Sequence, residues 1–178
     1  EVNMLLRMRK MPHYPGNREH PEFTVSVTTR EQITPRLLKF DPAVLYVPLH
    51  ILAADPEFTR QLARRVHVAA SLPRIVHDGE MARIRDALRL VSAQGVSEAL
   101  VGNLGLLKLV QEVGMKARGD FGLNIFNSLA TLALKDLKEM KPESATLSFE
   151  MTLAQVRDVS KAVPCELMVY GRMPLMVT

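Results

Sequence analysis

Residues 119–128 place one carboxylate and two carboxamides, those of Asp120, Asn124 and Asn127, where an apolar segment gives way to a helical pattern. An apolar strand does not need these three polar side chains in order to fold. Glu150 ends a later apolar segment, and an acid in such a position is costly unless it is paired or hydrated. We therefore interpret Asp120 and Glu150 as candidate catalytic residues, an acid/base pair of the kind used in sugar hydrolysis or proton transfer.

Other polar residues follow the remaining apolar segments of the chain. The candidate ligand-binding residues are Asn124 and Asn127 together with Arg30, His50, Arg74, Asn103 and Arg172. The arginines near one rim would suit an anionic ligand such as a phosphate or a carboxylate, because a guanidinium group binds these groups through paired hydrogen bonds.

Structural roles are the alternative for several of these residues. Asn103 and Asn127 are also in the right place to be helix caps, since asparagine is favoured there. Asp120 could be paired with Arg118 or Arg74 in a structural ion pair. His50 also fits a hydrogen-bonded loop residue. The sequence does not decide between these roles.

Strands and helices that would position these residues alternate along the chain. Apolar and β-branched runs predict strands at residues 23–28, 44–47, 66–71, 99–101, 115–118, 146–149 and 166–170. Helical patterns follow at residues 31–40, 55–65, 78–95, 104–114, 129–140 and 152–162. Asp55-Pro56-Glu57 is a typical helix start, and Gly95 is typical of a left-handed helix end.

Strict alternation predicts an α/β fold with parallel strands and right-handed crossovers. We favour a compact β/α, TIM-like barrel of about seven parallel strands whose last unit is missing, although such barrels typically have ~250 residues. An open doubly wound sheet is the alternative. It is disfavoured because Gly102-Asn103-Leu104-Gly105 lacks the spacing of a dinucleotide-binding turn. In either fold the ligand site is expected at the C-terminal ends of the strands.

Composition is that of an ordinary globular domain. The 178 residues are 47% hydrophobic and 24% charged, with a formal net charge of +4. No apolar run approaches the ~20 residues of a membrane helix, so no membrane partner is expected. A single cysteine, Cys165, excludes an internal disulfide and a multi-cysteine metal site within these residues, so no metal ligands are predicted and a cytoplasmic setting is expected.

The two ends of the chain lead us to expect a piece of a longer protein. The chain starts without Met and stops inside an apolar stretch. Pro12, Pro15, Gly16 and Pro21 break any periodic pattern near the start. We predict a linker or entry strap from a preceding domain at residues 1–22, and a barrel-like domain, truncated at its C-terminus, at residues 23–178.

Three segments resemble the collagenase-like peptidase family U32. Residues 119–128, Gly-Asp-Phe-Gly-Leu-Asn-Ile-Phe-Asn-Ser, resemble a strand-end motif of that family. Residues 148–151 resemble its Ser-x-Glu-Leu segment, with Met151 in place of Leu, and residues 166–176 resemble the approach to its C-terminal signature. The proline-rich leader resembles a junction in the larger members, which implies that this chain is a fragment of one of them and a second, degenerate repeat.

The resemblance implies a barrel-like α/β core and a hydrolase, a peptidase of unknown mechanism acting on a peptide substrate. Other members take part in hydroxylation of ribosomal RNA, transfer RNA or quinone precursors, several with an iron–sulfur cluster. This implies, as an alternative, a scaffold domain of an RNA-hydroxylating protein. The cluster cysteines would follow the region of Gly171, beyond the last residue here, and Cys165 does not match them. A further alternative is a non-catalytic binding module that works with the remainder of the parent chain and is inactive alone.

Overall fold

A single seven-stranded sheet of parallel strands forms the centre of the computed structural model, which describes residues 21–172. Its strands are β1 (Thr24–Ser26), β2 (Val44–Pro48), β3 (Val68–Ser71), β4 (Glu98–Val101), β5 (Lys116–Gly119), β6 (Ala145–Thr146) and β7 (Cys165–Glu166). The expected leader, apart from its last two residues, and the last part of the C-terminal resemblance lie outside the described residues.

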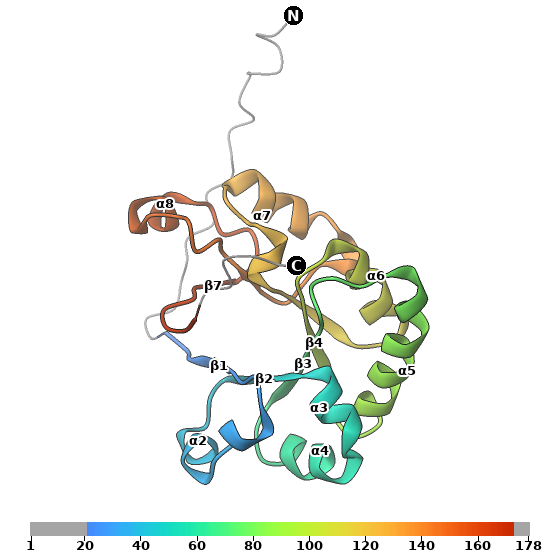
Figure 1. The fold of residues 1–178 in the computed structure, drawn as a ribbon. Helices are drawn as coiled ribbons and strands as arrows, with labels where there is room; N and C mark the ends of the chain where they lie inside the picture. The colour runs from blue at the N-terminus through green and yellow to red at the C-terminus, as the bar shows by residue number, and fades with distance from the viewer. Residues whose placement is uncertain (1–20, 173–178) are drawn as a thin grey trace, which may run out of the picture.

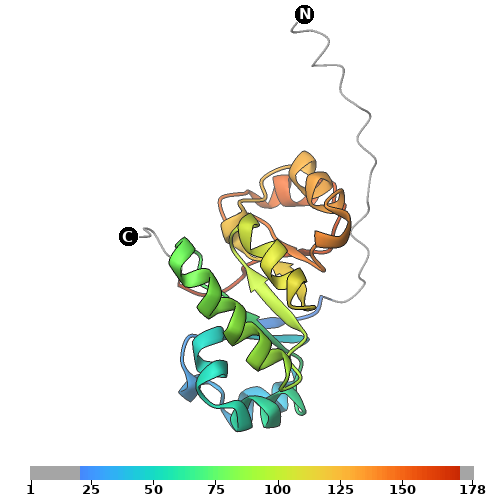
Figure 2. The ribbon, with the colours of Figure 1, turned by 90° about the vertical axis from the view of Figure 1, so that its right-hand side faces the viewer.

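Helices connect the strands and lie on the outer side of the sheet (Figures 1 and 2). The α-helices are α2 (Pro35–Phe40), α3 (Leu49–Ala54), α4 (Pro56–Ala63), α5 (Met81–Ser92), α6 (Leu104–Glu112), α7 (Ser128–Lys135) and α8 (Leu153–Asp158). Short 3₁₀ turns add η1 (Arg30–Gln32), η2 (Asp78–Glu80), η3 (Phe121–Leu123) and η4 (Lys138–Met140).

The strand order follows the chain order from β1 to β7. A doubly wound sheet instead reverses its order at a switch point. The predicted TIM-like α/β fold is therefore confirmed, as a curled half-barrel that lacks its last unit, and the doubly wound alternative is wrong. All seven strands deliver their C-terminal ends to one rim, because every neighbouring pair is parallel.

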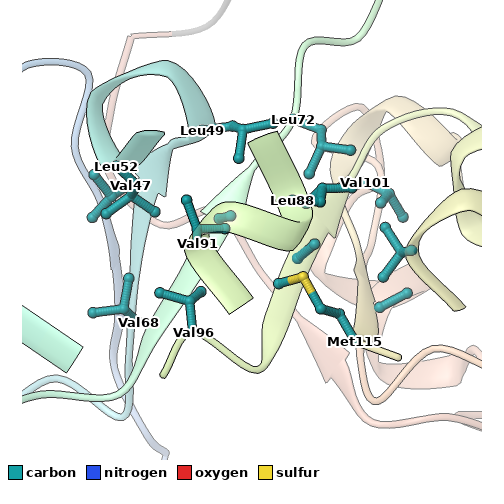
Figure 3. Close-up of a cluster of buried hydrophobic side chains, with 14 of the residues drawn as sticks. Val47, Leu49, Leu52, Val68, Leu72, Leu88, Val91, Val96, Val101 and Met115 are labelled. Atoms are coloured by element: carbon teal, nitrogen blue, oxygen red, sulfur yellow. The ribbon is translucent and has the colours of Figure 1, made fainter. Parts of the chain in front are cut away.

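The main hydrophobic core lies between the sheet and the helices. Leu88 and Val91 of α5 are fully buried and pack among side chains of the strands, such as Val47 and Val101 (Figure 3). A second cluster joins β6 to α7 and α8 through residues that include Leu134. Burial of these aliphatic side chains, at roughly 25 cal/mol per Å² of apolar surface, stabilises the sheet from its outer side.

The inner side of the sheet is less apolar. A small buried cluster, Val44, Tyr46, Ala69 and Leu100, lies on the strand positions that alternate with those of the main core. Side chains of a strand point alternately to its two faces, so these residues point into the curl of the barrel. Other inward positions carry polar groups, among them Glu98, Arg118 and Glu166.

Several predicted elements differ from the structure. The helix expected at residues 31–40 is divided into η1 and α2, because Thr34 caps a new helix and Pro35 can only stand in its first turn. The helix expected at residues 129–140 ends at Lys135 and is followed by η4.

Two further differences concern the ends of strands. α3 follows β2 directly and was not predicted, since only its continuation as α4 has a recognisable start at Asp55. β7 ends at Glu166, so the apolar residues 167–170 are exposed and do not extend the strand.

Candidate functional site

Asp120 stands at the C-terminal end of β5, directly after Gly119, the last residue of that strand. Its backbone N–H donates to the carbonyl of Val101 at the end of β4, at 2.8 Å. Its Oδ1 accepts a hydrogen bond of 2.8 Å from the N–H of Phe121 and so caps η3. The strand ladder and the cap together fix this carboxylate at the rim where the β/α fold binds ligands.

Burial raises the pKa of Asp120 above its ordinary range. The N–H of Phe121 and the charge of Arg74 act against this shift, and the negative charge of Glu166 adds to it. A carboxyl group with a raised pKa can exchange a proton more readily near neutral pH than an ordinary aspartate. This property is common at catalytic sites, although structural networks also produce it.

A hollow of about 440 Å³ opens beside Asp120 at the same rim. Its lining comes from the loops after β3, β4 and β5, namely Arg74, Ile75, Gly102, Asn103, Leu104, Gly122 and Leu123. The guanidinium of Arg74 lies 4.7 Å from the centre of the Phe121 ring, a cation–π arrangement.

Two glycines allow the three loops to approach this closely. A Cβ atom on Gly122 would stand 2.7 Å from the carbonyl oxygen of Gly102, closer than real Cβ contacts allow. A Cβ atom on Gly102 would stand 3.0 Å from Cγ of Arg74 and 3.7 Å from Oδ2 of Asp120. Side chains at these two positions would therefore displace the arginine or separate the loops.

A second polar cluster fills the inside of the half-barrel around Glu166 of β7. The Tyr46 hydroxyl donates to its carboxylate at 2.8 and 2.9 Å, Thr24 donates at 3.0 Å, and Ser144 also donates. Arg118 of β5 contributes an ion pair of 3.1 Å. Burial, together with the adjacent negative charge of Glu166, raises the pKa of Tyr46, so its hydroxyl stays protonated and remains a donor.

Arg118 connects this carboxylate to a second one. Its Nε donates to Glu98 of β4. Burial acts to lower the pKa of Arg118, but this hydrogen bond and the charges of Glu98 and Glu166 together raise it. His67 lies 3.4 Å from the other oxygen of Glu98. Because His67 precedes β3 and Glu98 begins β4, this end of the cluster faces the opposite mouth of the barrel from Asp120.

No buried side-chain nitrogen or oxygen in the described part of the chain lacks a hydrogen-bond partner. The inner cluster is therefore fully satisfied. A satisfied buried network is rigid, whereas the rim beside Asp120 keeps an arginine that faces an open hollow.

The two candidate catalytic carboxylates differ in their surroundings. The loops that carry them lie side by side, since the Phe121 and Phe149 rings are 5.6 Å apart. Glu150 itself is exposed, and its backbone N–H is held by Ser148. The charges that act on Asp120 are those of Arg74 and Glu166. The predicted pairing of Asp120 with Glu150 stays a prediction.

Most of the candidate ligand-binding residues have local structural contacts. Asn103 accepts from the N–H of Gly105 at 2.9 Å and Asn127 from that of Ala130 at 3.0 Å, so both cap helices. Asn124 takes a left-handed conformation, with φ of 52°, at the end of η3. Arg30 pairs with Asp55 at 3.0 Å.

The remaining two candidates are exposed residues. His50 lies in α3 and Arg172 is the last described residue. The structure therefore brings only Asp120, Arg74 and Asn103 together around the hollow at the rim.

Sequence reasoning missed the inner cluster, in particular Glu166, Glu98 and Tyr46. A signal was present, since Tyr46 lies within an apolar strand, Glu98 begins an otherwise apolar strand, and Glu166 ends a strand beside Leu167. Their convergence could not be predicted, because it depends on the curl that brings β7 across to β1 and β2.

One family model matches the sequence, that of peptidase family U32, over residues 52–178. This match covers more than two thirds of the chain and includes Asp120 and every residue that lines the hollow beside it. The chain belongs to peptidase family U32. No curated protein matches the sequence closely enough to add a second assignment. The U32 match begins within α3, so the matched part contains Glu166 and Arg118 but not Tyr46 or Thr24.

Within residues 21–172 of this U32 chain, no group of three or more histidine, cysteine, aspartate or glutamate side chains is placed to hold a metal ion. Cys165 is a free thiol, and burial raises its pKa to about 11. An iron–sulfur cluster elsewhere in the parent protein stays a prediction. Among the helices of the described residues, none has the length and apolar character required to cross a bilayer.

Proposed function

We propose that the C-terminal rim of this U32 domain hydrolyses peptide bonds and that Asp120 is its acid–base group. One observation carries the proposal: a partly buried carboxyl group with a raised pKa stands at the end of β5, beside a hollow large enough for a peptide residue. Membership of peptidase family U32 supports peptide hydrolysis as the choice of reaction.

In this proposal a water molecule is the nucleophile. Ionised Asp120 accepts a proton from the water as its oxygen adds to the scissile carbonyl carbon. The same carboxyl group then gives the proton to the leaving nitrogen as the C–N bond breaks, which yields a carboxylic acid and an amine and regenerates ionised Asp120. The charge of Arg74 favours the ionised form of Asp120 that begins this cycle. Glu150 is a candidate second carboxylate, because its loop adjoins that of Asp120.

Asp120→Asn tests the proposal directly. We expect the variant to lose peptide turnover by roughly 10²- to 10⁴-fold, the usual contribution of a general acid–base group. Turnover would be measured with a quenched-fluorescence peptide library. Asp136→Asn is the matched control, because Asp136 is an exposed residue at the C-terminal end of α7. Equal activity of wild type and Asp120→Asn would refute the assignment and indicate a contaminating protease.

The pH dependence adds a second test. The base must be ionised, so kcat/KM should rise with pH through a pKa above the ordinary aspartate range.

The free energy of unfolding should fall as pH rises over the same range. A raised folded-state pKa means that the folded protein binds the proton more tightly, so stability falls as pH rises from the unfolded to the folded pKa. Urea unfolding of Asp120→Asn should lack this fall.

A further inference from the structure

The hollow at the rim has one charged side chain in its lining, that of Arg74. Within residues 21–172 the guanidinium group of Arg74 makes no hydrogen bond and no ion pair. One of its planar faces is instead occupied by the Phe121 ring at 4.7 Å. Stacking on a ring leaves the N–H groups along the edge of a guanidinium available for a ligand.

The rest of the lining is mainly apolar or glycine. Ile75 and Leu104 are 49% and 60% exposed, which is high for large aliphatic side chains, and Leu123 completes the apolar wall. A pocket with apolar walls and one positioned polar group is typical of sites for small organic ligands. A ligand that matches this hollow would combine a negative charge with an apolar group.

A ligand of this hollow is expected to carry a small negative charge. Asp120 lies close enough to Arg74 for their charges to interact, so a highly charged anion such as phosphate would also be repelled by the aspartate. A carboxylate carries a single charge and is planar, which matches the edge of one guanidinium group.

We propose that Arg74 binds a carboxylate that carries an adjacent aliphatic side chain, in the manner of the C-terminal residue of a peptide. The carboxylate contacts the guanidinium edge, and the aliphatic group lies against Ile75, Leu104 and Leu123. This inference deepens the proposed peptide hydrolysis and rests on it for the choice of a peptide. The binding step itself is independent of turnover.

Equilibrium binding tests the inference. The probe is an N-acetylated dipeptide ending in leucine, titrated into the full 178-residue chain and followed by amide chemical shifts. The same dipeptide with a C-terminal amide is the matched ligand. We expect the free acid to bind at least about 10-fold more tightly than the amide, since hydrogen bonds to charged groups contribute strongly. The shifts should concentrate at Gly102 and Gly122.

Variants of the pocket sharpen the test. Arg74→Ala should weaken binding of the free acid about 10-fold and leave binding of the amide unchanged. Arg74→Lys should recover part of the lost affinity for the acid. Gly102→Ala keeps the arginine, but the added methyl group would crowd Cγ of Arg74. The variant should therefore also bind the free acid more weakly. Arg83→Ala is the control, because Arg83 is an exposed arginine of α5 that pairs with Glu80.

Several results would overturn the inference. They are the absence of acid binding to the wild type, equal binding of acid and amide, unchanged binding to Arg74→Ala, and displacement of the acid by equimolar inorganic phosphate. Failure of the proposed function is a separate result. If Asp120→Asn keeps full turnover while Arg74→Ala loses acid binding, the carboxylate site stands and the acid–base assignment falls.

Discussion

At the scale of single residues, the carboxylates of Glu98 and Glu166 have a different environment from that of Asp120. Glu98 and Glu166 share Arg118 inside the half-barrel, and their hydrogen bonds come from neighbouring strands. Asp120 instead accepts a hydrogen bond from one backbone N–H, and the charge of Arg74 that favours its ionised form is opposed by that of Glu166. The first arrangement pairs each carboxylate with a counter-charge, whereas the second leaves a carboxyl group whose pKa is raised by burial.

Arg118→Met tests the structural role of the inner cluster. The side chains of Arg118 and Glu98 are 16% and 9% exposed, so the substitution leaves buried carboxylates without their counter-charge. We expect a loss of about 3–5 kcal/mol in the free energy of unfolding, measured in urea. Arg83→Met, on the exposed face of α5, should change stability by less than about 0.5 kcal/mol. A loss of under about 1 kcal/mol for Arg118→Met would show that the ion pairs are not essential.

At the scale of elements, helix caps account for the two asparagines that end rim loops. The side chains of Asn103 and Asn127 accept from backbone N–H groups of α6 and α7, which would otherwise lack partners. These caps fix where each helix begins, and thereby fix the loops that surround the hollow. An asparagine at the end of a strand can therefore shape a site without contacting a ligand.

Asn127→Ala distinguishes a cap from a ligand contact. Loss of the cap should lower the free energy of unfolding by about 1 kcal/mol, while peptide turnover stays at the wild-type level. Asn127→Asp keeps an equivalent cap and should retain stability. A fall in turnover in both variants, with stability retained in the aspartate variant, would assign Asn127 to ligand binding instead.

At the scale of the whole molecule, the hydrogen bond between Thr24 and Glu166 joins the first strand to the last. These residues are 142 positions apart in the chain, and the bond spans the gap between β1 and β7. Figure 1 shows the two ends of the strand series next to each other. The half-barrel is therefore closed by side chains where backbone pairing is absent.

Thr24→Val removes this connection while it keeps the shape of the side chain. We expect a loss of about 1.5 kcal/mol, the lower end of the range for a hydrogen bond to a charged group, because the site is only part-buried. Amide hydrogen exchange should accelerate at Val27, which donates to the carbonyl of Tyr46, more than in β4. Thr24→Ser keeps the hydroxyl and serves as the control. Equal exchange in both variants would contradict the role of the bond.

Local signals in the sequence determined the order of elements, the helix starts and the strand ends that carry polar residues. Asp55 with Pro56, the left-handed Gly95 and the capping asparagines all act within a few positions of the chain, so the sequence alone predicts them. Strict alternation of strands and helices predicted parallel strands, and the lack of a dinucleotide-binding turn favoured a β/α barrel without its last unit over a doubly wound sheet. Asp120 and Arg74 could be named as rim residues for the same reason.

Only the tertiary structure decided which charges meet. The curl of the sheet brings Glu166 to Thr24, Tyr46 and Arg118, contacts that span from 48 to 142 positions of the chain. The choice of Arg74 as the neighbour of Asp120 depends on the close approach of two loops at Gly102 and Gly122. Side-chain pairing across strands depends on register and curvature, which no local pattern of residues specifies.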